Sequence, residues 1–141
     1  MRTTLTEPTL KTFMTRFASG YDSVVRGVNL IYPYSWFTKP PPPNEETLNI
    51  TLLLSVVDQS SQQWCNLHLS FSDVQEFHIY EREGGYYNTL SDGLRIAWLN
   101  GLVYTAFSND GATSNSLDSF KSAKRYVAAR ELSWKTEPYD R

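Results

Sequence analysis

Several ingredients of common functional sites are scarce in this 141-residue chain. It has one cysteine, Cys65, which excludes an intramolecular disulfide and a cysteine-based zinc site. It has two histidines, His68 and His78. The sequence also lacks a glycine-rich phosphate loop and a Gly-x-Ser-x-Gly nucleophile motif. These absences leave few routes to catalysis that the sequence itself would reveal.

A strong charge of one sign and a long hydrophobic run are missing as well. The chain has 13 Lys and Arg against 15 Asp and Glu, and a net charge of -2 argues against nucleic-acid binding. The longest apolar-rich run, residues 48–57, is short and interrupted by polar residues, so it does not predict a membrane span. Residues 1–10 lack the apolar stretch of a signal peptide. We therefore expect no nucleic-acid partner, no membrane association and a cytoplasmic location.

Aromatic residues, in contrast, are abundant. They make up 14% of the chain, and apolar residues as a whole make up 40%, which is the composition of a folded domain. The length is that of one domain, so we predict a single domain over residues 1–141. Aromatic side chains favour strands and also occur in protein interfaces, so the composition indicates a β-rich fold or a binding surface.

The clearest helix signal lies near the N-terminus. Four apolar residues recur at helical spacing: Leu10, Phe13, Met14 and Phe17. Thr6 before them suits the start of a helix, and Gly20 after them suits its end. This pattern predicts one long helix whose apolar stripe packs on the protein's own sheet.

Most of the remaining chain alternates with the period of a β-strand. Strands are predicted at 23–32, 47–58, 64–72, 76–83, 94–99, 102–107 and 125–135, with a stiff proline connector at 40–43 and a short helix near 116–122 capped by Ser116. Asn100 and Gly101 predict a type I′ turn that pairs Leu99 with Leu102. The fold class is α+β: a strongly curved or barrel-like antiparallel sheet of about six to seven strands, arranged as a meander around the N-terminal helix.

The phase of each predicted strand assigns its side chains to two faces. In the strand at 23–32, we expect Val24, Val28, Leu30 and Tyr32 to share the apolar face. In the strand at 64–72, the apolar face is Cys65, Leu67, Leu69 and Phe71, which leaves Trp64, Asn66, His68 and Ser70 on the opposite face. The strand at 76–83 is expected to bury Phe77 and Ile79.

The two histidines are the first candidate site. A hairpin through 72–74, with Asp73 in its turn, would bring His68 and His78 to one face together with Glu76. Three readings stay open: solvent-facing side chains, a polar patch in a binding surface, or a metal or catalytic site. A metal site usually needs three or four ligands, and a catalytic histidine needs an orienting partner. We prefer the first reading and expect no catalytic residue, no metal and no cofactor.

Two further groups predict a binding surface. The first is a set of aromatic residues in predicted loops: Tyr34, Trp36, Phe37, Tyr86 and Tyr87. They could instead fold over the open ends of the sheet. The second is the stretch 119–130, which contains Lys121, Lys124, Arg125 and Arg130 and no acid. It is either a docking patch for an acidic partner or a solvated strand edge.

These patterns favour a small non-enzymatic module that binds another protein, and its general character is typical of small bacterial binding domains. An immunity- or inhibitor-type role is one concrete form, by analogy of size and composition. The alternatives are a small-molecule binder with Trp98, Tyr104 or Trp134 lining a cavity, and a hydrolase or metal site around His68 and His78. A homodimer is compatible with each of these hypotheses.

Overall fold

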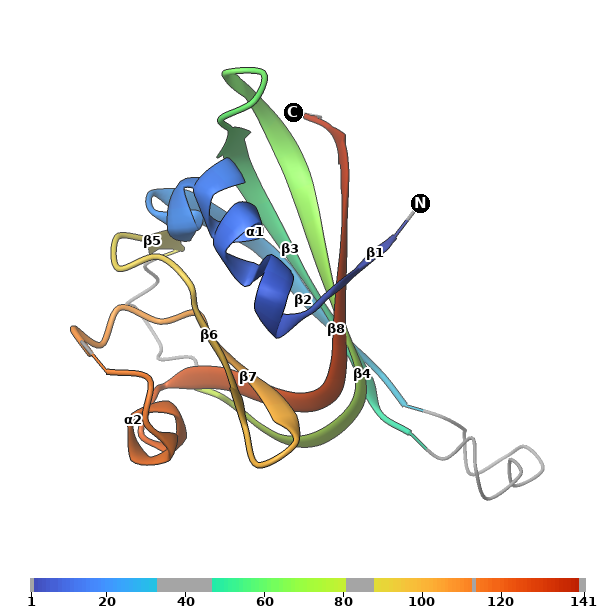
Figure 1. The fold of residues 1–141 in the computed structure, drawn as a ribbon, viewed down its shortest axis with the longest axis vertical. Coiled ribbons are helices and arrows are strands. Elements are labelled where there is room, and N and C mark those ends of the chain that lie inside the picture. Colours follow the sequence, from blue (N-terminus) through green and yellow to red (C-terminus); the bar gives the residue numbers. More distant parts are fainter. Residues whose placement is uncertain (1, 33–46, 81–87, 113, 140–141) are drawn as a thin grey trace.

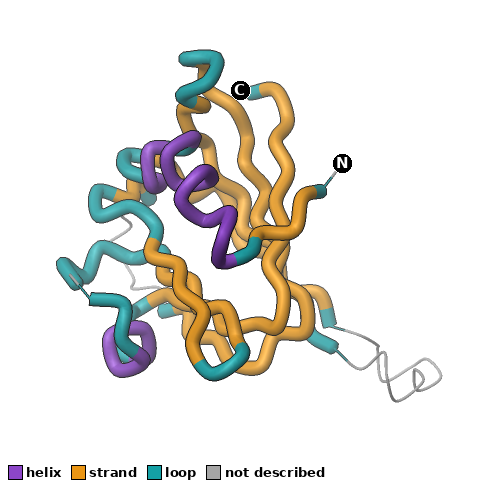
Figure 2. Tube along the Cα trace, viewed as in Figure 1, coloured by secondary structure: helices purple, strands orange, loops and turns teal. Residues whose placement is uncertain are grey.

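The computed structural model describes residues 2–32, 47–80, 88–112 and 114–139. It shows an α+β fold in which an antiparallel sheet curls into a half-barrel around a short helix, α1 (Figures 1 and 2). The strand order is β5-β2-β3-β4-β8-β7-β6, and β1 joins as an eighth strand by pairing with β8. The strands are β1 (Thr3–Leu5), β2 (Ser23–Ile31), β3 (Asn49–Asp58), β4 (Gln63–Ile79), β5 (Thr89–Leu90), β6 (Arg95–Leu99), β7 (Leu102–Ala106) and β8 (Arg125–Pro138). The predicted fold class is therefore confirmed.

Two long strands organise the sheet. β4 has 17 residues and β8 has 14, and they pair with each other from Cys65–Pro138 to Ile79–Arg125. Both bend near the middle, as Figure 1 shows. β4 pairs on its other side with β3 up to Phe71, whereas β8 pairs with β1 after the bend and with β7 before it. The simple meander predicted from the sequence is wrong, because β4 pairs with a strand at the far end of the chain.

The bend in β4 falls at Asp73. This residue has a φ of 54°, a left-handed conformation that aspartate adopts more readily than most side chains. The ladder with β8 shifts register between Val74 and Glu76, as at a β-bulge. The sequence prediction of a hairpin at 72–74 is therefore wrong, since Asp73 bends one continuous strand instead of reversing the chain.

The N-terminal helical region consists of three short pieces. They are η1 (Glu7–Thr9), α1 (Leu10–Arg16) and η2 (Ala18–Gly20). Thr6 precedes the first turn as predicted, and the Thr9 hydroxyl accepts its backbone N–H at 3.0 Å. Gly20 ends the region with a φ of 72°. The helix is thus shorter than the periodicity predicted, and no helix of the described residues is long and apolar enough to cross a membrane.

Buried side chains occupy both faces of the sheet. The main cluster lies on the concave face, where Phe13 of α1 and Phe17, the residue after this helix, pack against Trp134 of β8, with ring centroids 5.6 and 5.5 Å from that of the tryptophan. A second cluster lies on the opposite face of β7 and the first half of β8, beneath α2 (Leu117–Lys121). There, the ring of Phe120 lies 5.6 Å from that of Tyr104. Each helix therefore covers a different face.

The local predictions for the C-terminal third are confirmed. Asn100 and Gly101 have φ of 53° and 80°, as a type I′ turn requires, and Leu99 pairs with Leu102. Ser116 caps α2 by accepting the backbone N–H of Ser119 at 3.2 Å. The turn and the helix cap each depend on residues close together in the sequence, so the local sequence pattern is enough to predict them.

The phase of β2 differs from the prediction. Its pairing with β3 shifts between Val25 and Gly27, so Arg26 occupies a bulge. As a result Val25 is the buried residue before the bulge, where the sequence pattern favoured Val24, whereas Val28 and Leu30 after the bulge pack against the core as predicted. Tyr32, which was expected on the same face, lies beyond the end of β2 and is 64% exposed. Phe77, also expected to be buried, is 38% exposed, because β3 no longer pairs with β4 at this point.

Candidate interaction surface

The two histidines do not form a common site. They lie on one strand ten residues apart, which corresponds to about 30 Å in an extended chain. The His68 Nε2 atom lies 3.2 Å from a carboxylate oxygen of Glu137. The His78 Nδ1 atom lies 3.3 Å from the backbone carbonyl of Ala123. No group of three or more potential metal ligands occurs among the described residues.

Glu76 and His78 both contact Tyr126, whereas His68 contacts Glu137. The Tyr126 hydroxyl donates a hydrogen bond to Glu76, and the Lys121 Nζ atom lies 3.6 Å from the other carboxylate oxygen. Burial of Tyr126, followed by its contact with Glu76, raises the pKa of the phenol well above its ordinary value. The His78 ring packs 6.4 Å from that of Tyr126. These contacts join β4, β8 and α2, which explains them as structural interactions.

The predicted basic stretch at 119–130 is only partly accessible. Arg125 is 7% exposed, and its guanidinium lies 5.3 Å from the centre of the Phe107 ring. Arg125, which was predicted to contribute to a docking patch, therefore offers little surface to a partner. Lys121 is paired with Glu76, and Lys124 is exposed. Trp36, Phe37, Tyr86 and Tyr87, the aromatic residues predicted to bind a partner, lie outside the described residues, as does Tyr34.

The side chains proposed to line a small-molecule cavity do not surround one space. Trp98 and Trp134 pack against the main cluster on the concave face. Tyr104 points to the other face of the sheet and packs beneath α2. Of the three alternatives, only Trp98 and Trp134 therefore lie on a common face of the sheet.

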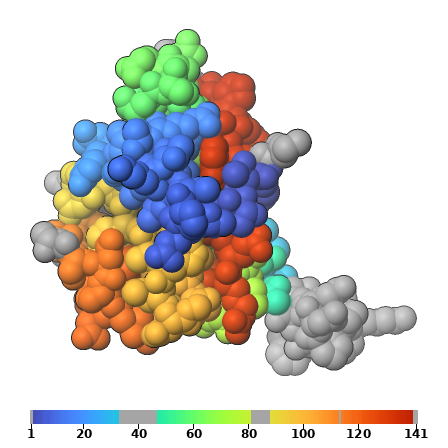
Figure 3. Space-filling view, in the orientation of Figure 1, coloured from blue at the N-terminus to red at the C-terminus, as the bar shows by residue number. Residues whose placement is uncertain are grey.

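A groove does exist between α1 and the turn that joins β3 to β4. Its volume is about 580 Å³, and its lining residues are Lys11, Thr12, Thr15, Arg16, Gln59 and Ser60. In the space-filling view, the N-terminal helical region lies between this turn and the β6–β7 hairpin (Figure 3). The groove is shallow, and long or polar side chains line it, in contrast to the aromatic walls typical of small-molecule sites.

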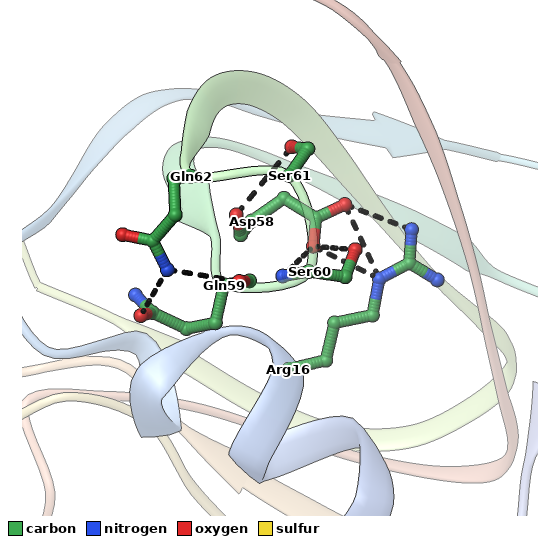
Figure 4. Close-up of polar contacts among 6 residues, drawn as sticks. All are labelled: Arg16, Asp58, Gln59, Ser60, Ser61 and Gln62. Carbon is green, nitrogen blue, oxygen red and sulfur yellow. Dashed lines mark hydrogen bonds and ion pairs between the residues drawn. The ribbon is translucent and has the colours of Figure 1, made fainter.

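Arg16, which lines this groove, is paired with Asp58 at the end of β3 (Figure 4). The Arg16 Nη2 and Nε atoms donate to the Asp58 carboxylate at 2.8 and 3.2 Å, and the Ser60 backbone N–H and hydroxyl donate to it at 3.0 and 2.6 Å. The hydrogen bond from Arg16 is the main cause that lowers the pKa of Asp58 from 3.8 to about 2. A carboxylate held in this way joins α1 to the turn and is a poor proton acceptor at neutral pH.

The outer face is a surface on which neither α1 nor α2 packs, and by this name we mean the side of β2, β3, β4 and the second half of β8 that is turned away from α1. Residues directly opposite on adjacent strands form rows across it. One row joins Leu53, His68 and Lys135, and another pairs Val57 with Trp64. Neither α1 nor α2 packs on this part of the sheet. The outer-face assignment of Trp64, Asn66, His68 and Ser70 is confirmed by these registers.

Two aromatic side chains lie at one end of the outer face. Trp64 is 47% exposed and Tyr139 is 42% exposed, and their ring centroids are 6.2 Å apart. Val57 is the cross-strand neighbour of Trp64 and is half-buried. Tryptophan and tyrosine in mutual contact keep a fixed orientation and offer large apolar area, which is typical of interface anchors.

Cations lie along the rest of the outer face. The Arg2 Nη1 atom donates to the Ser70 hydroxyl, and the Arg26 Nη1 atom donates to the Ser55 hydroxyl at 3.4 Å. The Lys135 Nζ atom lies 3.1 Å from Glu137, a contact that with the nearby His68 lowers the pKa of this carboxyl. Among the described residues, no carboxylate lies within ion-pair distance of Arg2 or Arg26. Sequence patterns missed both arginines, because neither belongs to a cluster in the chain.

Comparison with known proteins adds no relationship to these observations. No family model, curated protein or solved structure matches the chain.

Proposed function

We propose that this protein is a non-enzymatic binding module that docks a partner protein on its outer face. The observation that carries this proposal is the half-exposed pair Trp64 and Tyr139 on a sheet face that neither described helix covers. Isolated exposed apolar residues are common, but an exposed tryptophan in contact with an exposed tyrosine is characteristic of binding hot spots. An inhibitor- or immunity-type role would be one form of such a module.

The neighbouring side chains support this reading. The outer face combines an apolar end with polar and charged residues, which is the general composition of protein interfaces. The residues considered for a catalytic site contact other parts of the protein: Glu76 binds Tyr126 and Lys121, His68 lies beside Glu137, and His78 lies beside the Ala123 carbonyl. A small-molecule binder is the second candidate, and the volume of the groove beside α1, about 580 Å³, is the one observation that favours it, against its shallow form and polar lining.

Site-specific photo-crosslinking in the protein's own cells tests the proposal. A benzoylphenylalanine in place of Val57 should give a discrete crosslinked product, and Trp64→Ala in the same chain should abolish it. The matched control carries the same probe at Asn100, the exposed tip of the β6–β7 hairpin. Equal products from both probe positions, or a product that persists in Trp64→Ala, would contradict docking on the outer face.

A further inference from the structure

The outer face is electrically and chemically polarised along the direction of β4. The aromatic pair marks one end at Trp64, and the hydroxyl that holds Arg2 is that of Ser70, six residues further along the strand. Since a strand rises about 3.3 Å per residue, these two features are about 20 Å apart. From the bulge in β2, the Arg26 guanidinium reaches Ser55, which pairs with Asn66, and Lys135 pairs with His68. Measured along β4, the positions that these cations reach or pair with are Asn66, His68 and Ser70, which follow Trp64 at intervals of about 7 Å.

The charge of this surface differs from that of the whole chain. The chain has a net charge of -2. The four rows of the outer face that pass through Trp64, Asn66, His68 and Ser70 of β4 differ from this average. The charged side chains in or above these rows are the cations Arg2, Arg26 and Lys135 and the carboxylate Glu137. Glu131 lies one row further on, where it accepts a hydrogen bond from Thr4. Even with Glu131 included, the surface has three positive and two negative side chains. An acidic protein that gathers cations beside its exposed aromatic pair is suited to an acidic partner.

Resting on the proposed function, we infer that the partner segment is acidic and binds in an extended form along β4, with an apolar anchor at one end. The spacing of the rows along β4 determines where the acidic side chains of the partner segment would stand. In an extended segment, side chains on one face recur every two residues, about 6.6 Å apart, which matches the spacing along β4 of the rows that the cations reach. The anchor would contact Trp64 and Tyr139, and carboxylates two, four and six residues from it would lie near Arg26, Lys135 and Arg2.

Two synthetic peptides and the full-length, isotope-labelled chain provide the test. The first peptide has one tryptophan, glutamate at the second, fourth and sixth positions after it, and serine elsewhere. The second has glutamine in place of each glutamate, which keeps the shape and removes the charge. Binding is followed by amide chemical shifts at two salt concentrations. We expect the glutamate peptide to shift amides of β3, β4 and the second half of β8, and to bind about tenfold more tightly than the glutamine peptide at low salt.

Variants of the chain locate the charges that matter. Arg2→Gln together with Arg26→Gln should weaken binding of the glutamate peptide about tenfold and leave the glutamine peptide nearly unaffected. Lys11→Gln is the matched control, because Lys11 is an exposed cation on α1, at the concave side of the sheet. The control should bind as tightly as the unmodified chain. Trp64→Ala should weaken both peptides.

The outcomes separate this inference from the proposed function. Equal binding of the two peptides, shifts confined to another part of the protein, or no binding of either peptide would overturn the acidic, extended partner. A photo-crosslink from position 57 that depends on Trp64 would then still support a protein partner of different chemistry. Peptide binding without that crosslink would instead show that the face recognises acidic segments that the cell does not present to it.

Discussion

The ion pair between Arg16 and Asp58 gives a prediction whose size follows from the structure. Asp58 is 7% exposed, and four donors from Arg16 and Ser60 surround its carboxylate. The folded-state pKa is about 2 against an ordinary value of 3.8. This difference corresponds to about 2.5 kcal/mol of stability at neutral pH, at about 1.4 kcal/mol for each pH unit. The Arg16 side chain is 36% exposed, so water screens the pair, and we expect Asp58→Asn to cost about 1–2 kcal/mol.

The pH dependence distinguishes the charge from the shape of the side chain. A carboxyl whose pKa is lower in the folded state stabilises the fold above its unfolded pKa, and this contribution disappears as the pH falls through the folded value. The stability difference between the original chain and Asp58→Asn should therefore be constant above about pH 5 and shrink between about pH 4 and pH 2. Urea unfolding followed by tryptophan fluorescence is a suitable assay, since Trp134 lies 5.3 Å from the Arg16 guanidinium.

A control variant and a double-mutant cycle make this test specific. Asp118→Asn removes an exposed carboxylate from the first turn of α2 and should show only a small effect. Arg16→Gln combined with Asp58→Asn should cost clearly less than the sum of the two single substitutions. If the Asp58→Asn difference stays constant from pH 7 to pH 2, or if the two effects add, the carboxylate is not stabilised through Arg16 and the reasoning fails.

Three further predictions concern the rest of the fold. Gly93→Ala should destabilise the protein by at least about 1 kcal/mol more than Gly111→Ala in thermal melts. Both glycines have positive φ, but only at Gly93 would an added Cβ atom meet a backbone oxygen, that of Ser19, at 2.5 Å. Thr105→Val should leave the melting temperature unchanged or raise it, since the buried hydroxyl has no hydrogen-bond partner in the described structure. His68→Ala and His78→Ala should have additive effects on unfolding within about 0.5 kcal/mol, and a larger coupling would show that they share a site.

The features predicted correctly from the sequence are those set by local physics. The Asn100–Gly101 turn requires two residues that tolerate positive φ, and both stand at the required positions. The alternation of β3 separates the buried Leu52 and Leu54 from the half-buried Leu53. Ser116 offers a hydroxyl at the start of α2. In each case the physical cause lies within a few residues of its effect.

The wrong predictions concern features that are determined by pairing with distant parts of the chain. Whether Asp73 reverses β4 or only bends it depends on β8, which supplies partners on both sides of the bend more than 50 residues later. A strand of 17 residues is also about three times the common length, so a turn signal in its middle favours two strands. The bulge at Arg26, which moves burial from Val24 to Val25, is likewise determined by pairing with β3. Long-range pairing leaves little trace in local periodicity.

The candidate surface was predictable only in part, for the same reason. The period of β4 is enough to place Trp64 and His68 opposite the apolar face. Their neighbours Tyr139 and Lys135, and the arginine from residue 2, come from the two ends of the chain and join the surface through β1 and β8. A surface built from distant segments has no continuous signature in the sequence, in contrast to the basic stretch at 119–130.

The bend in β4 and β8 explains why one outer surface is covered and the other is open. On the first half of β8 and on the neighbouring strand β7, small and aromatic residues are buried beneath α2, among them Ala128 of β8 and Tyr104 and Ala106 of β7. After it, the same side of the sheet has buried hydroxyls such as Ser133 and no helix, yet it ends in a half-exposed Trp64. One exposed tryptophan would be common on any protein surface, but Trp64 contacts the exposed Tyr139, and the hydroxyls of Ser55 and Ser70 on the same face accept hydrogen bonds from arginines. An apolar anchor beside hydrogen-bonded cations is the arrangement that suits a polar partner carrying one apolar side chain.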